Sequence, residues 1–409
     1  MNTADKKSSV LLHDYFDLML IGSAHAFSDG FTNLLVPVLA LIVADFNLSA
    51  FQAGLLLSSY SFSTFLFVFP VSLAADYSGK KLEILLAGLA VSSIAYFSML
   101  GVEIFYLILI LAFIAGAGNA VYHPCGTAIT AERFKAIRPY AISVHGMMGN
   151  IGTSLIPVSM AFIAQMAGWR WAIASCTLPV IILLPALWIR FSPAGKSVKR
   201  ILKTGSHIKS SMSIALSVFR DRRVILLALV YALSGMGGKA SVGFIPLLLT
   251  QKYGLSTAFV GIMISVYFGM GIAAKPLLGF LYAKFGVRFA LGIPLLISFA
   301  ATLSLGIVSW APLLAVLIAV IGAANPISPV ILTAAADFSD PEKLASSVGL
   351  IYSLHAAGFV TPFISGFLAD RAGLYAAFVF ASVFFLSGAF LSTRLGKAVK
   401  QNNGGSNEE

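Results

Sequence analysis

The chain has 409 residues, of which 58% are hydrophobic and only 11% charged, and its mean hydropathy is +0.92. This composition excludes an ordinary soluble domain, because no soluble core requires so much apolar side chain. It predicts an all-α membrane protein, since a hydrocarbon layer about 30 Å thick requires roughly 20 mostly apolar residues per helical span.

Glycine, proline and charged clusters divide the chain into twelve predicted membrane-spanning helices. We expect them at residues 15–42, 50–74, 82–102, 104–130, 140–167, 169–191, 223–250, 255–283, 289–308, 311–336, 343–369 and 373–394. The long polar stretch 193–222 divides them six and six. The predicted organisation is therefore a tail over 1–14, a six-helix bundle over 15–192, a linker over 193–222, a second six-helix bundle over 223–395 and a tail over 396–409.

The formal charge of +11 is distributed unevenly between the two predicted sides of the membrane. Loops on one side carry 22 Lys and Arg residues, whereas the other side has only Arg170, Lys252 and Arg371. This positive-inside pattern places both termini and the linker in the cytoplasm, so we expect a multi-pass protein of the cytoplasmic (inner) membrane. Because the cations are spread over short loops, nucleic acid is not an expected partner.

Other features of the sequence exclude several kinds of site. Cys125 and Cys176 lie in apolar stretches, where a thiol behaves as a small hydrophobic group. The opening segment MNTADKKSSV has no apolar core of a cleavable signal peptide. No Walker A loop, hydrolase elbow or HExxH motif occurs. We therefore expect no cofactor, no metal and no enzymatic activity, and any energy must come from a gradient.

An internal repeat relates the two halves of the chain. A shift of 207 residues aligns a run in the first half with one in the second: Leu48, Ser49, Gly54, Ser58 and Tyr60 meet Leu255, Ser256, Gly261, Ser265 and Tyr267. A shift of 205 aligns Pro124 with Pro329 and Pro157 with Pro362. The repeat predicts two pseudo-symmetric bundles in parallel, with a site between them that suits alternating access.

The loop between the second and third helices carries the motif SLAADYSGKK, in which the informative residues are Asp76, Gly79, Lys80 and Lys81. Its second-half copy, GFLYAKFGVR, keeps the cations Lys284 and Arg288 but has Ala283 in place of the acid. By this motif the chain resembles the major facilitator superfamily over its whole length. A carboxylate at a helix end beside cations can latch neighbouring helices, so we expect these residues, with the helix-end acids Glu132 and Asp337, to form a gate.

Within that superfamily the chain is most similar to the fosmidomycin-resistance type of exporter. The resemblance is carried by three elements: His25 and Asp29 in SAHAFSDGF, the step Tyr122–His123–Pro124, and Gly149, Asn150, Gly152 and Pro157 in the fifth helix. It implies proton-driven export. Two positions depart from the pattern, since Cys125 replaces the acid after His-Pro and Ile156 replaces the glycine before Pro157.

Ionisable side chains inside a membrane cost several kcal/mol and are functional candidates by default. Asp29 lies four residues after His25, on the same helix face, so the two can share a proton. We predict that His25, Asp29 and His123 couple proton movement to transport. Two alternatives remain: Asp29 could orient the backbone at Gly30 or pair with a lysine, and His123 could satisfy carbonyls freed by the neighbouring proline.

Six further residues are predicted to contact the substrate: Lys239, Asn150, His355, Tyr60, Tyr267 and Lys275. The repeat places Lys239 opposite Thr32, roughly one turn from the level of Asp29. A pair with Asp29 across the cavity is feasible, and an anionic substrate or a proton could compete for it. The alternative is that the lysines extend to the membrane surface and that the polar residues join helices. His145 is a further candidate for proton relay.

Together these patterns predict a secondary transporter, specifically a proton-coupled exporter of a drug or an anionic metabolite. A proton-coupled importer of a nutrient and a membrane sensor that does not transport are the alternatives. The expected partners are a small-molecule substrate, protons and the lipid bilayer. A monomer is expected, because one chain holds a complete pathway.

Overall fold

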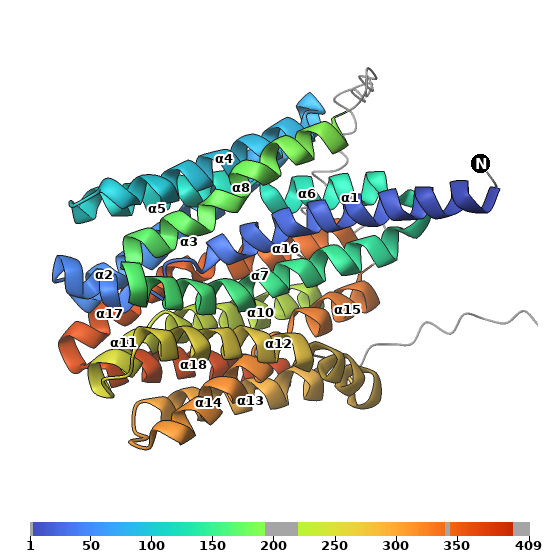
Figure 1. Cartoon of the computed structure of the whole chain (residues 1–409). Helices are drawn as coiled ribbons and strands as arrows, with labels where there is room; N and C mark the ends of the chain where they lie inside the picture. Colours follow the sequence, from blue (N-terminus) through green and yellow to red (C-terminus); the bar gives the residue numbers. More distant parts are fainter. Residues whose placement is uncertain (1–2, 193–219, 340–343, 396–409) are drawn as a thin grey trace, which may run out of the picture.

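The computed structural model describes residues 3–192, 220–339 and 344–395, and every regular element in these ranges is helical. The side chains of residues 3–14, 76, 77, 136, 139 and 344–346 lie outside this description. In Figure 1 the long helices run side by side in a common direction, with the N-terminus at one end of the molecule and α2, α11 and α17 at the other.

The first half consists of α1 (Thr3–Thr32), α2 (Leu39–Phe46), α3 (Ala50–Ser78), α4 (Lys81–Ser98), η1 (Met99–Gly101), α5 (Phe105–Asn119), α6 (Tyr122–Arg133), η2 (Lys135–Ile137), α7 (Arg138–Ala167) and α8 (Trp169–Phe191). The second half consists of α10 (Arg222–Val242), α11 (Ile245–Leu247), η3 (Leu248–Lys252), α12 (Thr257–Phe285), α13 (Val287–Leu305), α14 (Ala311–Ala324), α15 (Ser328–Phe338), α16 (Leu344–Ala356), η4 (Ala357–Val360), α17 (Thr361–Ala372) and α18 (Leu374–Ser392). Helix α1 begins within the segment expected as a tail. Most of the predicted linker and the predicted tail over 396–409 lie outside the described residues.

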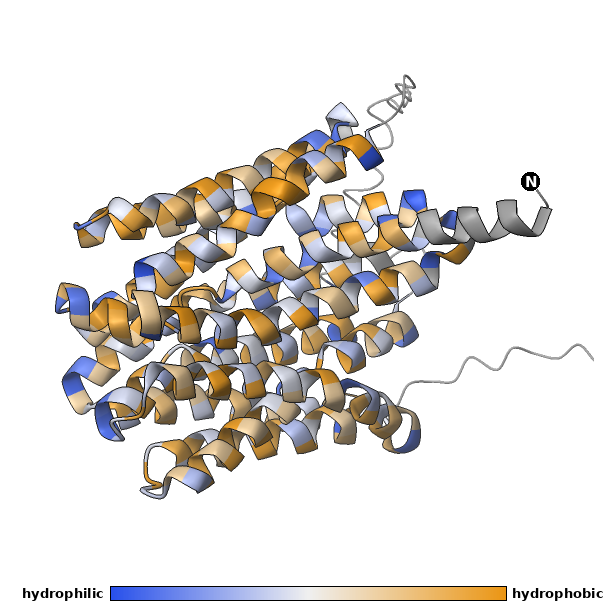
Figure 2. Cartoon of the chain, in the orientation of Figure 1, coloured by the Kyte–Doolittle hydropathy of each residue, from blue (hydrophilic) through white to orange (hydrophobic). Residues whose placement is uncertain are grey.

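Eleven helical segments in the described part are long and apolar enough to cross a membrane. Helix α1 corresponds to the span expected over 15–42, so the structure agrees with the predicted twelve-helix membrane fold. Figure 2 shows apolar residues along the lengths of the helices and hydrophilic residues concentrated near their ends. This distribution is the one that a bilayer requires.

Two helices that the sequence predicted as continuous are broken at corresponding points. The span 104–130 is divided into α5 and α6, and the span 311–336 into α14 and α15. Pro124 and Pro329 lie in the first turns of α6 and α15, where a missing backbone N–H removes no helical hydrogen bond. The prolines therefore favour a new helix start rather than a continued helix.

The two halves meet through two long helix pairs, α7 with α12 and α3 with α17. In the second pair the backbones approach so closely that Gly54 faces the carbonyl of Pro362 and Gly366 faces the carbonyl of Ala50. A side chain at either glycine would collide with main chain, so these positions allow the halves to close. This contact lies at the end of the molecule opposite the N-terminus (Figure 1).

Candidate functional site

A cluster of ionisable side chains, which we call the histidine–aspartate cluster, joins α1, α6 and α7; it consists of His25, Asp29, His123 and His145. Both carboxylate oxygens of Asp29 are engaged: Oδ2 lies 3.3 Å from His25 Nε2, and Oδ1 lies 3.3 Å from His123 Nε2. The imidazole of His25 stacks on that of His145 with ring centroids 4.2 Å apart. The structure thus brings together all three residues predicted for proton coupling.

The hydrogen bonds of His25 restrict what can lie between it and Asp29. Its Nδ1 is 2.7 Å from the carbonyl oxygen of His145. Since a carbonyl only accepts, Nδ1 carries the hydrogen, and in a neutral ring Nε2 then presents a lone pair. Nε2 is buried and has no hydrogen-bond partner. A lone pair facing an ionised carboxylate is repulsive, so the contact requires a proton between the two groups, on Nε2 or on the carboxyl, or another positive ion.

The cluster differs in accessibility from one member to the next. The side chain of His25 is only 9% exposed and that of Asp29 is 20% exposed, whereas that of His123 is 58% exposed. Below His25, the hydroxyl of Tyr122 donates to the carbonyl of Ile21 at 2.8 Å, which holds α6 against α1. The cluster therefore has a buried side and one member that can exchange ions with its surroundings.

Of the two predicted lysines, Lys275 makes a contact between the halves. Its Nζ donates to Asn150 Oδ1 at 2.8 Å, from α12 to α7. Lys239 is partly buried in α10 and has no hydrogen-bond or carboxylate partner among the described residues. The pairing of Lys239 with Asp29 that the sequence suggested is not formed, because the two histidines already occupy both oxygens of Asp29.

Tyr60 and Tyr267 each belong to a polar triad that the sequence reading missed. In the first half the Asn119 amide donates to Tyr60 Oη at 2.7 Å and accepts from Ser28 at 2.8 Å. In the second half Asn325 donates to Tyr267 Oη at 2.7 Å and accepts from Ser234 at 3.1 Å. Corresponding members differ by 206 or 207 in number, so the repeat offset could have revealed them. Substrate contact by the two tyrosines stays a prediction.

The remaining candidate, His355, lies in α16 on the second half. Its ring stacks on Tyr231 with centroids 4.0 Å apart and packs against Gly235 of α10. The first half has the reverse arrangement, since there a side chain of α1, Asp29, packs against Gly149 of α7. In each half one titratable side chain therefore faces one glycine where two corresponding helices meet. In the first half the titratable group is on α1 and the glycine on α7, whereas in the second half the glycine is on α10 and the titratable group on α16.

The predicted gate residues lie near the ends of their helices. Lys81 Nζ is 2.6 Å from Glu132 Oε1, which links the start of α4 to the end of α6. Gly79 and Gly286 end α3 and α12 with φ of +69° and +80°, a conformation that favours glycine. Lys80 is exposed, and the side chain of Asp76 lies outside the described residues. The gate function of this group stays a prediction.

In the second-half copy, the predicted gate residues are not paired with one another. Asp337 accepts a hydrogen bond from Tyr282, and the Arg288 guanidinium donates to the carbonyl of Leu395. Lys284 lies over the ring of Phe285, 5.3 Å from its centroid. Asp337 is therefore engaged by a neutral hydroxyl, whereas its first-half counterpart Glu132 is engaged by a cation.

Asp370 was missed by the sequence reading, although it joins the two halves. Its Oδ1 and Oδ2 accept from the backbone N–H groups of Ala50 and Phe51 at 2.7 and 2.9 Å. A carboxylate of α17 thereby caps the N-terminus of α3, where the helix dipole favours negative charge. The sequence has no short-range signal for this contact, because the residues are about 320 positions apart.

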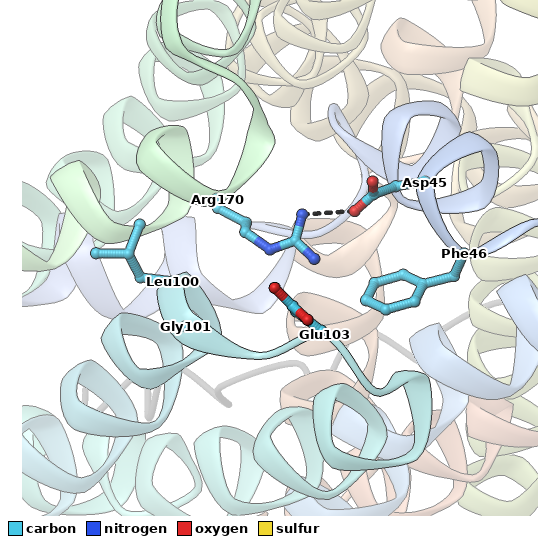
Figure 3. Close-up of a pocket in the computed structure, with 6 residues that line it drawn as sticks. All are labelled: Asp45, Phe46, Leu100, Gly101, Glu103 and Arg170. Carbon is cyan, nitrogen blue, oxygen red and sulfur yellow. Dashed lines mark hydrogen bonds and ion pairs between the residues drawn. The ribbon is translucent and has the colours of Figure 1, made fainter.

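A pocket of about 440 Å³ lies at the loops, away from the histidine–aspartate cluster, and is lined by Asp45, Phe46, Leu100, Gly101, Glu103 and Arg170 (Figure 3). The guanidinium of Arg170 is 2.5 Å from Asp45 and donates to the carbonyl of Val102 at 2.9 Å. These bonds tie loops of the first half together. No predicted coupling or substrate residue lines the pocket, so we assign it a structural role.

Both repeated halves of the chain match a known protein family. The model of the Major Facilitator Superfamily matches residues 20–238 and again residues 227–408. The chain belongs to the major facilitator superfamily. It is similar to the uncharacterized MFS-type transporter YfnC of Bacillus subtilis (strain 168), with 24% identity over 362 residues and 87% of each chain covered.

Solved transporters of this superfamily share the architecture. A bacterial homolog of the human lysosomal transporter Spinster, in an inward-facing and unoccupied conformation, matches with a TM-score of 0.80 and 17% identity, over 93% of this chain and 96% of that one. The nucleoside transporter NupG (D323A mutant) matches with a TM-score of 0.78 and 11% identity, over 93% of this chain and all of that one. At such identities the likeness shows the fold alone. The family is one of membrane transporters and not of enzymes.

Proposed function

We propose that this chain is a proton-coupled exporter of a small organic anion, which works by alternating access and resembles the fosmidomycin-resistance type. The observation that carries the proposal is the position of Asp29 between His25 and His123. The lone pair of His25 makes that contact favourable when a proton lies between the imidazole and the carboxyl, and we infer that the site binds and releases this proton as its surroundings change.

The substrate side of the proposal rests on the two lysines. Lys239 is a partly buried ammonium without a counter-ion in the described part of the chain, and Lys275 donates to the neutral amide of Asn150 and interacts with Asp29 only through its charge. The carboxylate of Asp29 is already shared by two imidazoles. An anion that binds between the halves would supply the missing charge, which favours anions over neutral or cationic solutes.

The proposed orientation places both termini and the linker over 193–222 in the cytoplasm, with bundles over 15–192 and 223–395. The Asp370 cap then lies on the outer side, where its bonds and the close packing of α3 on α17 hold the two halves together. Alternating access would break the contacts of Asp370 and form new ones at the opposite end, where the motif residues Asp76, Lys80 and Lys81 are the proposed gate.

The proposal is tested by growth of a host that lacks its own exporters, challenged with a compound panel that includes fosmidomycin. We expect resistance to anionic compounds in cells with the wild-type chain, and none with Asp29→Asn at equal protein abundance. Glu103→Gln is the matched control, because Glu103 is an exposed acid outside the cluster. Resistance that persists in Asp29→Asn would contradict the coupling role, and heightened sensitivity would indicate import.

A further inference from the structure

Three side chains of the histidine–aspartate cluster are arranged as a metal site. Donor atoms of His25, Asp29 and His123 all lie within 4.8 Å of one another, and the two imidazole-to-carboxylate distances are 3.3 Å. A transition metal with bonds of about 2.0 to 2.2 Å holds tetrahedral ligand atoms roughly 3.4 Å apart. A single ion therefore fits between the three groups after a small inward movement of His123, which is the exposed member.

The buried side of the cluster is prepared for a metal and not only for a proton. His25 Nδ1 donates to the carbonyl of His145, which leaves the free lone pair on Nε2, 3.3 Å from the carboxylate. Metal-bound histidines are usually held in this way by a carbonyl or carboxylate behind the ring. Nε2 is a buried nitrogen without a hydrogen-bond partner, on a side chain only 9% exposed.

We propose that His25, Asp29 and His123 form a binding site for a divalent first-row transition metal ion such as Co²⁺, Ni²⁺ or Zn²⁺. Two imidazole nitrogens and one carboxylate favour these ions over Mg²⁺ and Ca²⁺, which prefer sets of oxygen ligands. Three protein ligands leave at least one coordination position for water or for an anionic group. Gly149 allows the backbone of α7 to lie directly against Asp29 and His25, where a larger side chain would collide with both.

This inference concerns the same residues as the proposed coupling site, but it does not depend on transport. It is tested on the full chain, purified in detergent without a polyhistidine tag, stripped with chelator and titrated with Co²⁺. We expect one Co²⁺ per chain with the visible absorption of a four- or five-coordinate site. Because binding is measured directly, it can succeed or fail independently of any result for export.

Variants identify the ligands. Asp29→Asn and His123→Ala are expected to weaken Co²⁺ binding by at least about tenfold, while His355→Ala, which removes a histidine of the other half, leaves it unchanged. His123→Cys should retain binding and add a thiolate-to-cobalt charge-transfer absorption, which only direct contact produces. Because this variant should still bind Co²⁺, it also shows that a substitution at position 123 does not abolish binding merely by unfolding the protein. The proposal is overturned if no saturable equivalent binds, if the triad variants bind as the wild type does, or if His123→Cys binds without the new absorption.

Discussion

Gly149 lies directly against the carboxylate of Asp29, with no room for a methyl group at its α-carbon. A Cβ there would overlap Oδ2 and lie 2.9 Å from the ring of His25. One turn along α7, Gly152 is equally close to the backbone of Ala26. The glycines of α7 therefore set how closely α1 approaches, and with it the geometry of the histidine–aspartate cluster.

Gly149→Ala tests this dependence. The added methyl must displace Asp29 or separate α1 from α7, so we expect transport to fall by roughly tenfold or more and the free energy of unfolding by about 1 to 3 kcal/mol. Growth in the presence of an exported compound and thermal unfolding in detergent measure the two effects. Gly146→Ala is the matched control, because nothing lies within 4 Å of a Cβ at that position of the same helix. Equal transport by the two variants would show that the close approach is unimportant.

The hydroxyls of the two buried tyrosines should differ in their contribution to stability. Without the Tyr60 hydroxyl, the Asn119 amide keeps a second acceptor, because it also donates to Thr32 Oγ1 at 3.3 Å. The Asn325 amide has no acceptor other than Tyr267 in the described part of the chain. We therefore expect Tyr267→Phe to cost about 1 to 2 kcal/mol and Tyr60→Phe to cost less, since only in the first does a buried donor lose its one partner. Thermal unfolding midpoints measure the difference, and the exposed control Tyr106→Phe should not change them. Equal losses for the two variants would mean that Thr32 does not compensate for the lost hydroxyl.

Much of the fold was predictable because its signals are periodic or repeated along the chain. Apolar runs identified the spans, and the shift near 206 identified the two halves. The helix breaks after Asn119 and near Pro326 were missed, because by length and composition each segment still qualifies as one continuous span. Only the tertiary bonds of the asparagines show that polar groups stabilise these breaks.

The site was predictable where its members are close in sequence and uncertain where they are not. The spacing of His25 and Asp29 places them on one helix face, and the structure brings them together. A pair of Asp29 with Lys239 was feasible from the sequence but is not formed in the structure. Pairing across helices depends on rotation about each helix axis, which hydropathy does not fix. Asp370 was missed for the same reason, since it acts on residues of the other half.

Lys239 provides a test in which stability and function should change in opposite directions. A partly buried ammonium without a counter-ion destabilises the unliganded protein, so we expect Lys239→Met to raise the thermal unfolding midpoint. The same change should weaken the effect of an anionic compound by roughly ten- to a hundredfold, because a charge-assisted bond of about 1.5 to 3 kcal/mol is lost. Lys239→Arg, which keeps the charge, is the control and should retain part of the function. Destabilisation by Lys239→Met would indicate that the lysine has a structural role instead.

Asp370→Ala should shift the balance between the two access states. In the closed arrangement its carboxylate accepts from the N–H groups of Ala50 and Phe51, and both bonds must break when α17 moves away from α3. Loss of about 1 to 2 kcal/mol from the closed state alone changes the ratio of states by roughly five- to thirtyfold. The reporter is a cysteine at Ser58, a buried position between the halves, in a chain with Cys125 and Cys176 replaced by serine.

Reaction of that cysteine with a membrane-impermeant maleimide, added from the outside of whole cells, measures the open population. We expect Asp370→Ala to raise the labelling rate and Asp370→Asn, which keeps one acceptor oxygen, to raise it less. Glu103→Ala is the control, because Glu103 is also an exposed acid near this end but makes no contact with the second half in the described part of the chain. If labelling is the same with and without the Asp370 carboxylate, the cap does not hold the halves together, and glycine-mediated packing of α3 on α17 would have to account for closure.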